Sequence, residues 1–347
     1  MGGEVVKITV LMSVFNTPAP MLERSIESVL SQSLADVEFL ILDDGSTAPT
    51  TKTYLAQAAA RDSRVRLFWE PHRGLTPTLN RGLALAQGQL IARQDADDWS
   101  EPERLARQAA YLDSHPETGL LGCAALTHQQ DETALWPVCM PQTQAHILAA
   151  FESRNPFIHG SVMFRAAAAR AVGGYREELR CSQDYDFFWR LTETAGAANL
   201  AEPLYHYRYA ASSVSVSRAA EQDRGVRAAR LLAQARHRGE IENVAQALGN
   251  AGDPSEAQRA RRAPADELET ASRRTPFCAS FLKDNENGIR AELKQADHLM
   301  LAGDYADAAR AYWALARTRP TSLLAWAKLA RLAVFFLSPP LRRWSFR

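Results

Sequence analysis

The stretch Leu90-Ile91-Ala92-Arg93-Gln94-Asp95-Ala96-Asp97-Asp98 runs from an apolar segment directly into a cluster of carboxylates. The apolar residues predict a buried strand that ends at the acidic cluster. Carboxylates this close repel one another, and placing them at the end of a buried strand is costly unless they share a cation. Hard ions such as Mg²⁺ or Mn²⁺ prefer oxygen ligands and keep positions open for substrate phosphates. The alternative is an acidic, solvated turn that caps the next helix.

Before this stretch, β-branched and apolar segments alternate with segments of helical spacing. The expected strands and helices are residues 8–15, 21–34, 37–42, 53–60, 65–69, 75–86 and 89–92, in the order strand, helix, strand, helix, strand, helix, strand. This alternation predicts an α/β fold with a mostly parallel sheet flanked by helices on both faces. Asn16, Asp43, Asp44 and the Asp95 cluster all follow strand ends. Ligands of such sheets bind at that edge, so we expect a crevice there.

The pattern is less regular from residue 142 to 217. We expect a strand over residues 157–164, a turn at 172–175 and a helix beginning near residue 183. Beyond residue 217 the chain is rich in Ala, Arg, Glu and Gln without a strand pattern. The sequence therefore predicts one domain at residues 1–217 and an all-α C-terminal domain at residues 218–347.

Part of the C-terminal domain resembles a tetratricopeptide repeat. Gly303-Asp304-Tyr305-Ala306-Asp307-Ala308-Ala309 is followed by Tyr312, Leu315 and Pro320. One such repeat cannot bury its own apolar face and would need neighbours. A generic helical hairpin is an equal alternative.

Composition excludes several classes of protein. The 347 residues fit two domains, and 40 basic residues balance 40 acidic ones, so we expect no nucleic-acid partner. The 4 cysteines are scattered without a C-x-x-C pair, which argues against zinc and against a disulfide framework. No secretory signal or membrane-spanning run is apparent, so we expect a cytoplasmic protein. The apolar run Leu332–Leu337 and the basic tail after it leave open a peripheral contact with a membrane or a protein through the C-terminal helices.

Several short segments, in this order, resemble family 2 glycosyltransferases of the GT-A fold over roughly residues 7–217. They are Ser13-Val14-Phe15-Asn16, Leu42-Asp43-Asp44-Gly45-Ser46-Thr47, Leu79-Asn80-Arg81-Gly82-Leu83, the stretch from Ile91 to Asp98, Gly173-Gly174-Tyr175 and Gln183-Asp184-Tyr185-Asp186. The resemblance implies a GT-A, Rossmann-like sheet. It also implies transfer of a sugar, with inversion, from a nucleotide diphosphate sugar to a hydroxyl of a glycan or lipid-linked acceptor. We expect a UDP-sugar.

The resemblance assigns roles to particular residues. The nucleotide sugar would contact Phe15, Asn16, Asp43, Asp44, Arg93, Asp95 and Arg208. Asp97 and Asp95 would bind Mn²⁺ or Mg²⁺, which neutralises the departing diphosphate. Asp184 would be the catalytic base, and His159 would lie on the acceptor side.

Each assignment has an alternative. Phe15 could be a core aromatic, and Asp43, Asp44 or Asp98 could cap a helix. Arg93 could form a salt bridge with an aspartate. Asp186 is a second candidate base, although it should point away from the site.

The chain departs from the family pattern at Gln183, where Glu is common, and at Ala210, where many relatives carry His. Arg208, Ser213 or His206 could supply the missing phosphate contact. These departures favour an alternative function, a helical-repeat interaction protein with a degenerate transferase domain. A nucleotidyltransferase is disfavoured because residues 16–20 lack a glycine-rich basic loop.

Overall fold

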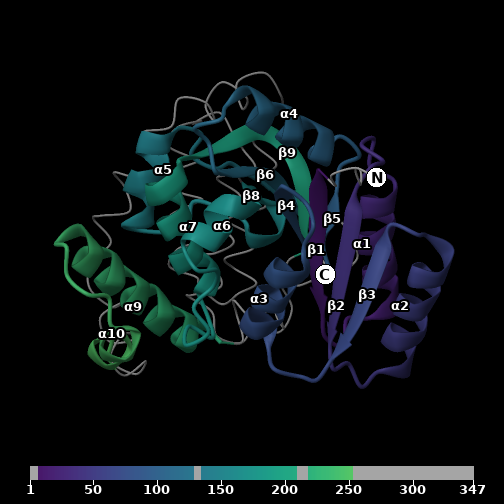
Figure 1. Ribbon diagram of the computed structural model, residues 1–347, viewed down its shortest axis with the longest axis horizontal. Helices are drawn as coiled ribbons and strands as arrows, with labels where there is room; N and C mark the ends of the chain where they lie inside the picture. The colour runs from purple at the N-terminus through teal and green to yellow at the C-terminus, as the bar shows by residue number, and fades with distance from the viewer. Residues whose placement is uncertain (1–6, 129–133, 209–217, 253–347) are drawn as a thin grey trace, which may run out of the picture. The chain divides into compact units, whose positions relative to one another are not determined.

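The computed structural model describes residues 7–128, 134–208 and 218–252 (Figure 1). The segment that resembles a tetratricopeptide repeat, the C-terminal tail, and the positions of Ala210 and Ser213 lie outside these residues. No helix in the described ranges is long and apolar enough to cross a lipid bilayer.

The strands form a mixed sheet, and four neighbouring strands on one side of it are parallel. They are β1 (Ile8–Val14), β2 (Glu38–Asp44), β3 (Val65–Glu70), β4 (Leu90–Asp95), β5 (Trp99–Ser100), β6 (Leu120–His128), β7 (Ala134–Val138), β8 (Met163–Arg165) and β9 (Ala197–Arg208). One path through the sheet runs β3-β2-β1-β4-β8-β6-β9-β5. Strand β1 is parallel to β2 and β4, β2 is parallel to β3, and β6 is parallel to β9. Strand β8 is antiparallel to β4 and β6, and β5 is antiparallel to β9.

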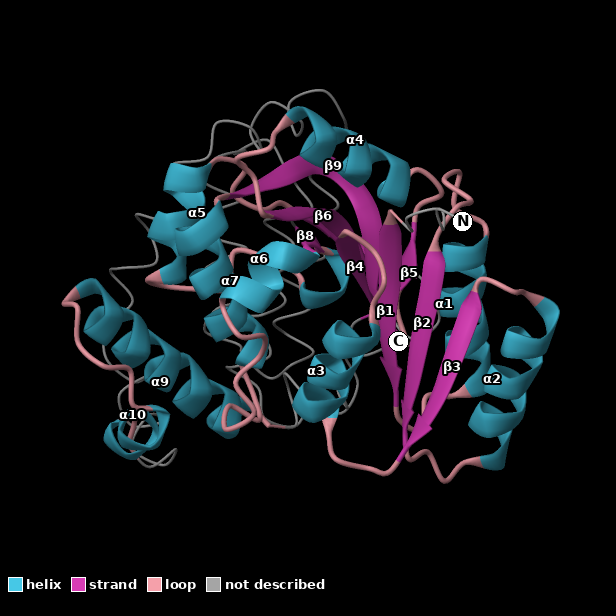
Figure 2. Cartoon of the chain, viewed as in Figure 1, coloured by secondary structure: helices cyan, strands magenta, loops and turns pink. Residues whose placement is uncertain are grey.

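Helices cover both faces of this sheet (Figure 2). They are α1 (Ala19–Leu30), α2 (Pro49–Arg61), α3 (Leu75–Leu85), α4 (Arg104–Ser114), α5 (Gln144–Phe151), α6 (Ala166–Ala171), α7 (Gln183–Ala195), α9 (Ala219–His237) and α10 (Val244–Asn250), with a 3-10 turn, η1 (His159–Ser161). Apolar side chains of α1, α2 and α4 pack with one face of β1 and β2. The opposite face packs with α3, α5, α6 and α7, and α9 packs against α7.

The structure confirms the predicted fold class, because a largely parallel sheet lies between helical layers. The four strands and three helices expected before residue 96 are present, with small differences in their ends. The strand expected over residues 157–164 is wrong for most of its length: the turn η1 occupies 159–161, and β8 covers only Met163–Arg165.

Helix α9 begins at Ala219, where helical structure was expected, and its Ala229 and Ala233 belong to the same apolar cluster as α7. The proposed boundary near residue 218 stays a prediction.

Candidate active site

The two aspartates that end β2 have different surroundings. The Asp44 carboxylate is buried and accepts hydrogen bonds from the backbone N–H groups of Arg73 (2.8 Å) and Gly74 (2.9 Å). It also lies 2.9 Å from Nδ1 of His72. Because Gly74 is the N-cap residue of α3, Asp44 anchors the loop that leads into that helix. This contact occupies both oxygens of Asp44.

Asp43 is buried too, but only one of its oxygens has a partner. Its Oδ2 accepts a hydrogen bond from the backbone N–H of Ser46 (3.0 Å). Within the described ranges its Oδ1 has no hydrogen-bond partner. Asp43 lines an open pocket of about 530 Å³, together with residues of α2, Gly45 and the half-exposed Trp69 of β3. An unpaired buried oxygen carries a desolvation cost, which an N–H group of a ligand would relieve. Neither aspartate caps α2, whose N-cap residue is Ala48.

Phe15 and Asn16, which follow β1, have separate roles. Phe15 is 46% exposed and stacks on the His72 ring, with 4.1 Å between ring centroids, so the core alternative is wrong. Asn16 adopts a left-handed backbone with φ of 51°, and its Oδ1 accepts hydrogen bonds from the backbone N–H groups of Thr47 and Ala48. Asn16 therefore holds the loop after β2, whereas Phe15 offers a flat ring to solvent.

The acidic cluster spans the end of β4 and the turn after it. Asp95 is the last residue of β4, and its side chain is 28% exposed. Ala96 and Asp97 lie in a turn after the strand, so Asp95 and Asp97 do not belong to one extended segment. Asp97 is exposed, yet surrounding protein atoms and the negative charge of Asp95 raise its pKa to about 6.

Asp98, the third carboxylate, is buried and binds β9. It accepts hydrogen bonds from the Tyr205 hydroxyl (2.9 Å) and from the backbone N–H of Arg208 (2.7 Å). Burial, and then the charges of Asp97 and Asp95, raise its pKa well above the usual range. The proposed helix cap is not formed, because α4 begins after Glu103 without a side-chain cap. Asp98 instead joins the turn to a strand more than a hundred residues further along the chain.

Arg208 and His206 lie on β9 rather than in a loop. The Nε–H of Arg208 donates to the backbone carbonyl of Asp97 (2.9 Å), and its guanidinium lies 5.1 Å from the Trp99 ring centroid. Arg208 thus lies directly beside the exposed carboxylate. His206 stacks on Trp99 and contacts Glu101 and His128. These contacts disfavour His206 as a substitute for the position of Ala210.

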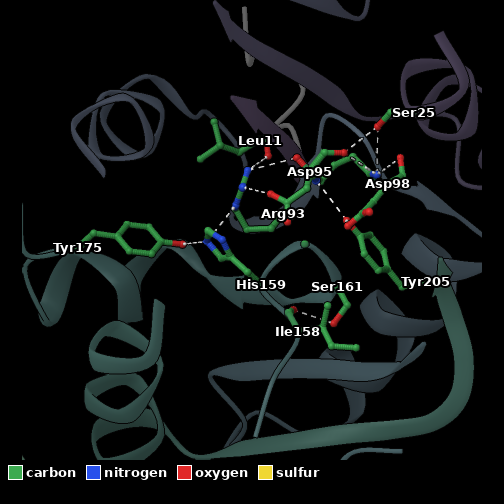
Figure 3. A network of polar contacts seen from close by, with 12 residues as sticks. Leu11, Ser25, Arg93, Asp95, Asp98, Ile158, His159, Ser161, Tyr175 and Tyr205 are labelled. Carbon is green, nitrogen blue, oxygen red and sulfur yellow. Dashed lines mark hydrogen bonds and ion pairs between the residues drawn. The ribbon is translucent and has the colours of Figure 1, made fainter. Parts of the chain in front are cut away.

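Arg93 and His159 meet behind the acidic cluster (Figure 3). The Arg93 guanidinium is fully buried and donates to Oδ1 of Asp95 at 2.6 Å. Its Nε lies 3.5 Å from Nε2 of His159. The salt-bridge alternative is therefore what the structure shows. Because the guanidinium is fully buried, Arg93 is not exposed for direct contact with a ligand.

Asp184 lies in the first turn of α7, partly buried, and its Oδ2 accepts a hydrogen bond from the side chain of Asn155 (2.8 Å). The charges of Asp95 and Asp184 oppose the lowering of the His159 pKa, which burial and then the positive charge of Arg93 cause. Asp186 is buried and forms ion pairs with Arg176 and Arg190, so it is not available as a base. The sequence did not single out Asn155, because nothing in its local pattern marks it.

Two of the quoted segments meet in space. The side chain of Asn80 in α3 accepts a hydrogen bond from the backbone N–H of Tyr175 and donates to its carbonyl, both at 2.9 Å. The Tyr175 hydroxyl in turn lies 3.2 Å from Nε2 of His159. Sequence analysis treated Tyr175 only as part of a turn, and its hydroxyl was missed.

The donor set of the acidic cluster fits a magnesium- or manganese-type site. In the part of the chain that the structure describes, no group of three or more His, Cys, Asp or Glu side chains could hold a metal by itself. Mg²⁺ is usually bound by one or two carboxylates together with substrate phosphates. Asp95 and Asp97 could supply those carboxylates; desolvation by the surrounding protein atoms and then the negative charge of Asp95 raise the pKa of Asp97, and a cation would offset that charge.

Comparison with known proteins identifies the family of this chain. The model of glycosyl transferase family 2 matches residues 9–173. The chain is 34% identical to the putative glycosyltransferase EpsE of Bacillus subtilis, over 58% of this chain and 73% of that protein. It is 30% identical to the amylovoran biosynthesis glycosyltransferase AmsE of Erwinia amylovora, over 60% of this chain and 79% of that protein. The chain therefore belongs to glycosyltransferase family 2.

Two further likenesses have narrower scope. The O-antigen biosynthesis protein RfbC of Myxococcus xanthus is 31% identical over 64% of this chain, but the match spans only 17% of that longer protein. The crystal structure of S. aureus TarS 1-349 in complex with UDP-GlcNAc superimposes with a TM-score of 0.53 at 17% identity, and the match covers 94% of this chain and 89% of that one. That likeness supports the GT-A-like fold and nothing finer.

Proposed function

We propose that this glycosyltransferase is inverting and metal-dependent, and that it moves a sugar from a nucleotide diphosphate sugar to a hydroxyl of a glycan or lipid-linked acceptor. The observation that carries the proposal is the pairing of a partly exposed Asp95 with an exposed Asp97, whose pKa is raised to about 6 by desolvation among the surrounding protein atoms and then by the charge of Asp95. Two crowded carboxylates at a strand end suit a divalent cation that also binds a diphosphate.

The nucleotide would bind at the end of β2. Asp43 Oδ1 is a buried acceptor that has no hydrogen-bond partner among the residues the structure describes, which suits one ring N–H of a base such as uracil. The exposed ring of Phe15 offers a stacking surface. TarS was solved with UDP-GlcNAc, and at 17% identity that likeness supports the fold alone. A UDP-sugar is therefore a proposal that rests on Asp43.

Asp97 and Asp95 would hold Mn²⁺ or Mg²⁺ against the two phosphates. The ion would stabilise the negative charge that builds on the departing diphosphate. Arg208 would add a positive charge at the same place, because its guanidinium is held against the Asp97 carbonyl. Asp98 and Arg93 would keep this arrangement in place from the buried side.

Asp184 would act as the general base for transfer. It would take the proton from the acceptor hydroxyl as that oxygen forms a bond to C1 of the sugar. The bond from C1 to the phosphate oxygen breaks on the opposite face, so the configuration at C1 inverts. The hydrogen bond from Asn155 would fix the direction of the Asp184 carboxylate.

The names of the relatives suggest the acceptor class. AmsE is named for amylovoran biosynthesis and RfbC for O-antigen biosynthesis. We infer that this enzyme works in the cytoplasm on a surface polysaccharide or its lipid-linked precursor. Contact with a membrane or protein through the C-terminal helices remains part of the proposal.

Calorimetry tests the proposal with UDP, GDP and dTDP, each with and without Mn²⁺. We expect metal-dependent binding of one of these nucleotides. Asp184→Asn should leave that binding nearly unchanged and abolish transfer. Absence of metal-dependent binding by all three would overturn the proposal and favour the alternative of a degenerate transferase domain in an interaction protein.

A further inference from the structure

A continuous polar chain runs from the Tyr175 hydroxyl to the metal-side carboxylate Asp95 (Figure 3). The Tyr175 hydroxyl lies 3.2 Å from Nε2 of His159, and the same nitrogen lies 3.5 Å from Nε of Arg93. Arg93 then donates to Oδ1 of Asp95 at 2.6 Å. Each link is a side-chain contact, so His159 reaches Asp95 only through Arg93.

The chemistry of Arg93 decides the state of His159. A guanidinium has only donors, so its contact with Nε2 is favourable only when that nitrogen carries a lone pair. His159 is therefore the neutral tautomer with its proton on Nδ1. Burial, and then the positive charge of Arg93, lower the pKa of His159 and favour the same state. A neutral imidazole held in this way serves as a fixed acceptor for Arg93.

Arg93 is fixed on its remaining sides by the backbone. Its NH1 group donates to the carbonyls of Leu11 and Gln94, and its own carbonyl accepts from Arg104. Arg104 also donates to the Gly160 carbonyl, which ties the turn η1 to the same network. The orientation of Asp95 is thus set by a buried guanidinium whose Nε faces His159.

Gly160 shows how closely the turn approaches the acidic cluster. A Cβ atom at this position would lie 2.8 Å from Oδ2 of Asp95 and would overlap the Tyr205 hydroxyl. Only glycine permits this approach. The residue beside His159 therefore packs directly against the second oxygen of Asp95.

We propose that His159 is a positioning residue for Asp95: it accepts from Arg93 and so helps to fix the guanidinium that sets the direction of the Asp95 carboxylate on the metal side. This inference rests on the proposed metal-dependent function and replaces the expected contact of His159 with the acceptor. It assigns to His159 a role in metal binding although His159 is 64 positions from Asp95 in the sequence. Partners behind a metal ligand typically account for about 10- to 100-fold in metal affinity.

The test measures Mn²⁺ binding directly, by the electron paramagnetic resonance signal of free Mn²⁺, with whichever of UDP, GDP or dTDP the wild-type protein binds. The variants are His159→Leu, His159→Gln and Tyr175→Phe. The matched control is His115→Gln, a histidine at the end of α4 that stacks on Tyr111. We expect His159→Leu to raise the Mn²⁺ dissociation constant about 10-fold or more. His159→Gln should recover most of that loss, because its amide oxygen can accept from Arg93. Tyr175→Phe leaves the Nε2 lone pair to Arg93 alone and should give no increase, and neither should the control.

The outcomes separate this inference from the function on which it rests. If wild-type protein binds no Mn²⁺ with any of the nucleotides, the proposed function fails. If wild-type protein binds Mn²⁺ and His159→Leu binds it equally well, this inference is wrong. An unchanged Mn²⁺ constant with a raised KM for the acceptor would return His159 to the acceptor side. Thermal unfolding checks each variant, and if His159→Leu does not fold, unchanged Mn²⁺ binding by His159→Ala overturns the proposal.

Discussion

The ends of β2 and β4 each carry adjacent aspartates, and at each end the fold occupies one carboxylate and leaves another open. At β2, Asp44 anchors the loop before α3 while Asp43 keeps one oxygen without a partner. At β4, Asp98 binds β9 while Asp97 remains exposed. In each pair of neighbouring aspartates, therefore, one carboxylate stabilises the fold and the other can bind a ligand. Because the aspartates are chemically identical, the hydrogen-bond partners around each carboxylate decide its role.

The largest expected effect is the loss of transfer activity when Asp97 is substituted. Asp97→Asn removes an exposed ligand, so we expect transfer to fall by about a thousandfold or more, equivalent to about 4 kcal/mol of activation free energy. The melting temperature should change by no more than about 1 °C, because surface substitutions rarely alter stability. Steady-state rates and thermal unfolding check this. More than a tenth of wild-type activity would mean that Asp97 is not the main metal ligand.

Asp98 should show the opposite pattern in stability. Asp98→Ala deletes a buried group that accepts hydrogen bonds from Tyr205 and Arg208, so the free energy of unfolding should fall by about 2–4 kcal/mol. Asp98→Asn should cost less, because the raised pKa of Asp98 favours a neutral carboxyl that an amide resembles. Denaturant unfolding measures both variants. Equal losses for the two substitutions would contradict the neutral form.

Substitutions of Asp44 and Asp43, at the end of β2, should also separate stability from binding, with smaller effects. Asp44→Ala loses the contacts with Arg73 and Gly74 and should lower the free energy of unfolding by about 1–3 kcal/mol. Asp43→Asn should leave stability within about 1 kcal/mol, since an amide oxygen can still accept from Ser46. It should weaken nucleotide binding about tenfold, about 1.4 kcal/mol, measured by calorimetry. Unchanged nucleotide affinity would show that the base binds elsewhere.

The smallest effect is a pH dependence confined to the β4 end. Burial lowers the pKa of His206 below 6.5 in the folded protein, although Glu101 partly opposes this. Above pH 6.5 the His206 ring is neutral in both the folded and the unfolded chain, and its full contribution to the free energy of unfolding is present. As the pH falls below 6.5 the unfolded chain takes up the proton first, so stability decreases.

Melting temperatures of wild-type protein and His206→Gln, measured from pH 7.5 to 5.5, should therefore converge as the pH falls. The difference between the two proteins isolates His206, because Asp97 and Asp98, whose pKa values are raised, contribute in the opposite direction to both. Parallel curves would contradict a lowered pKa for His206.

The sequence predicted the strands and helices before residue 96 because their alternation is regular and each strand is rich in apolar and β-branched residues. It missed β6, α4, α5 and β9. Strand β9 contains Glu202 and Pro203, and its pairing with β6 shifts register between Cys123 and Ala125, which hides a strand pattern. The pairing that accommodates the proline is a tertiary feature, so no local signal could reveal it.

The candidate site shows the same limit. Position after a strand was enough to select Asp43, Asp44, Asp95 and Asp97 as candidates. It could not separate Asp43 from Asp44 or show that Asp98 binds β9, because the partners are supplied by distant parts of the chain. Arg93 illustrates this most clearly, since only the folded protein shows that its side chain is buried behind Asp95.

The contact between Asp98 and Arg208 joins positions 110 residues apart, and it bears on the order in which the site is completed during synthesis. The ribosome makes the chain from the N-terminus, so the parallel strands that carry all the acidic groups emerge long before β9. Until Arg208 has left the exit tunnel, the turn that contains Asp97 lacks the hydrogen bonds that Arg208 donates to Asp97 and Asp98. A nascent or truncated chain that ends before residue 208 therefore has every carboxylate of the cluster and no finished catalytic centre.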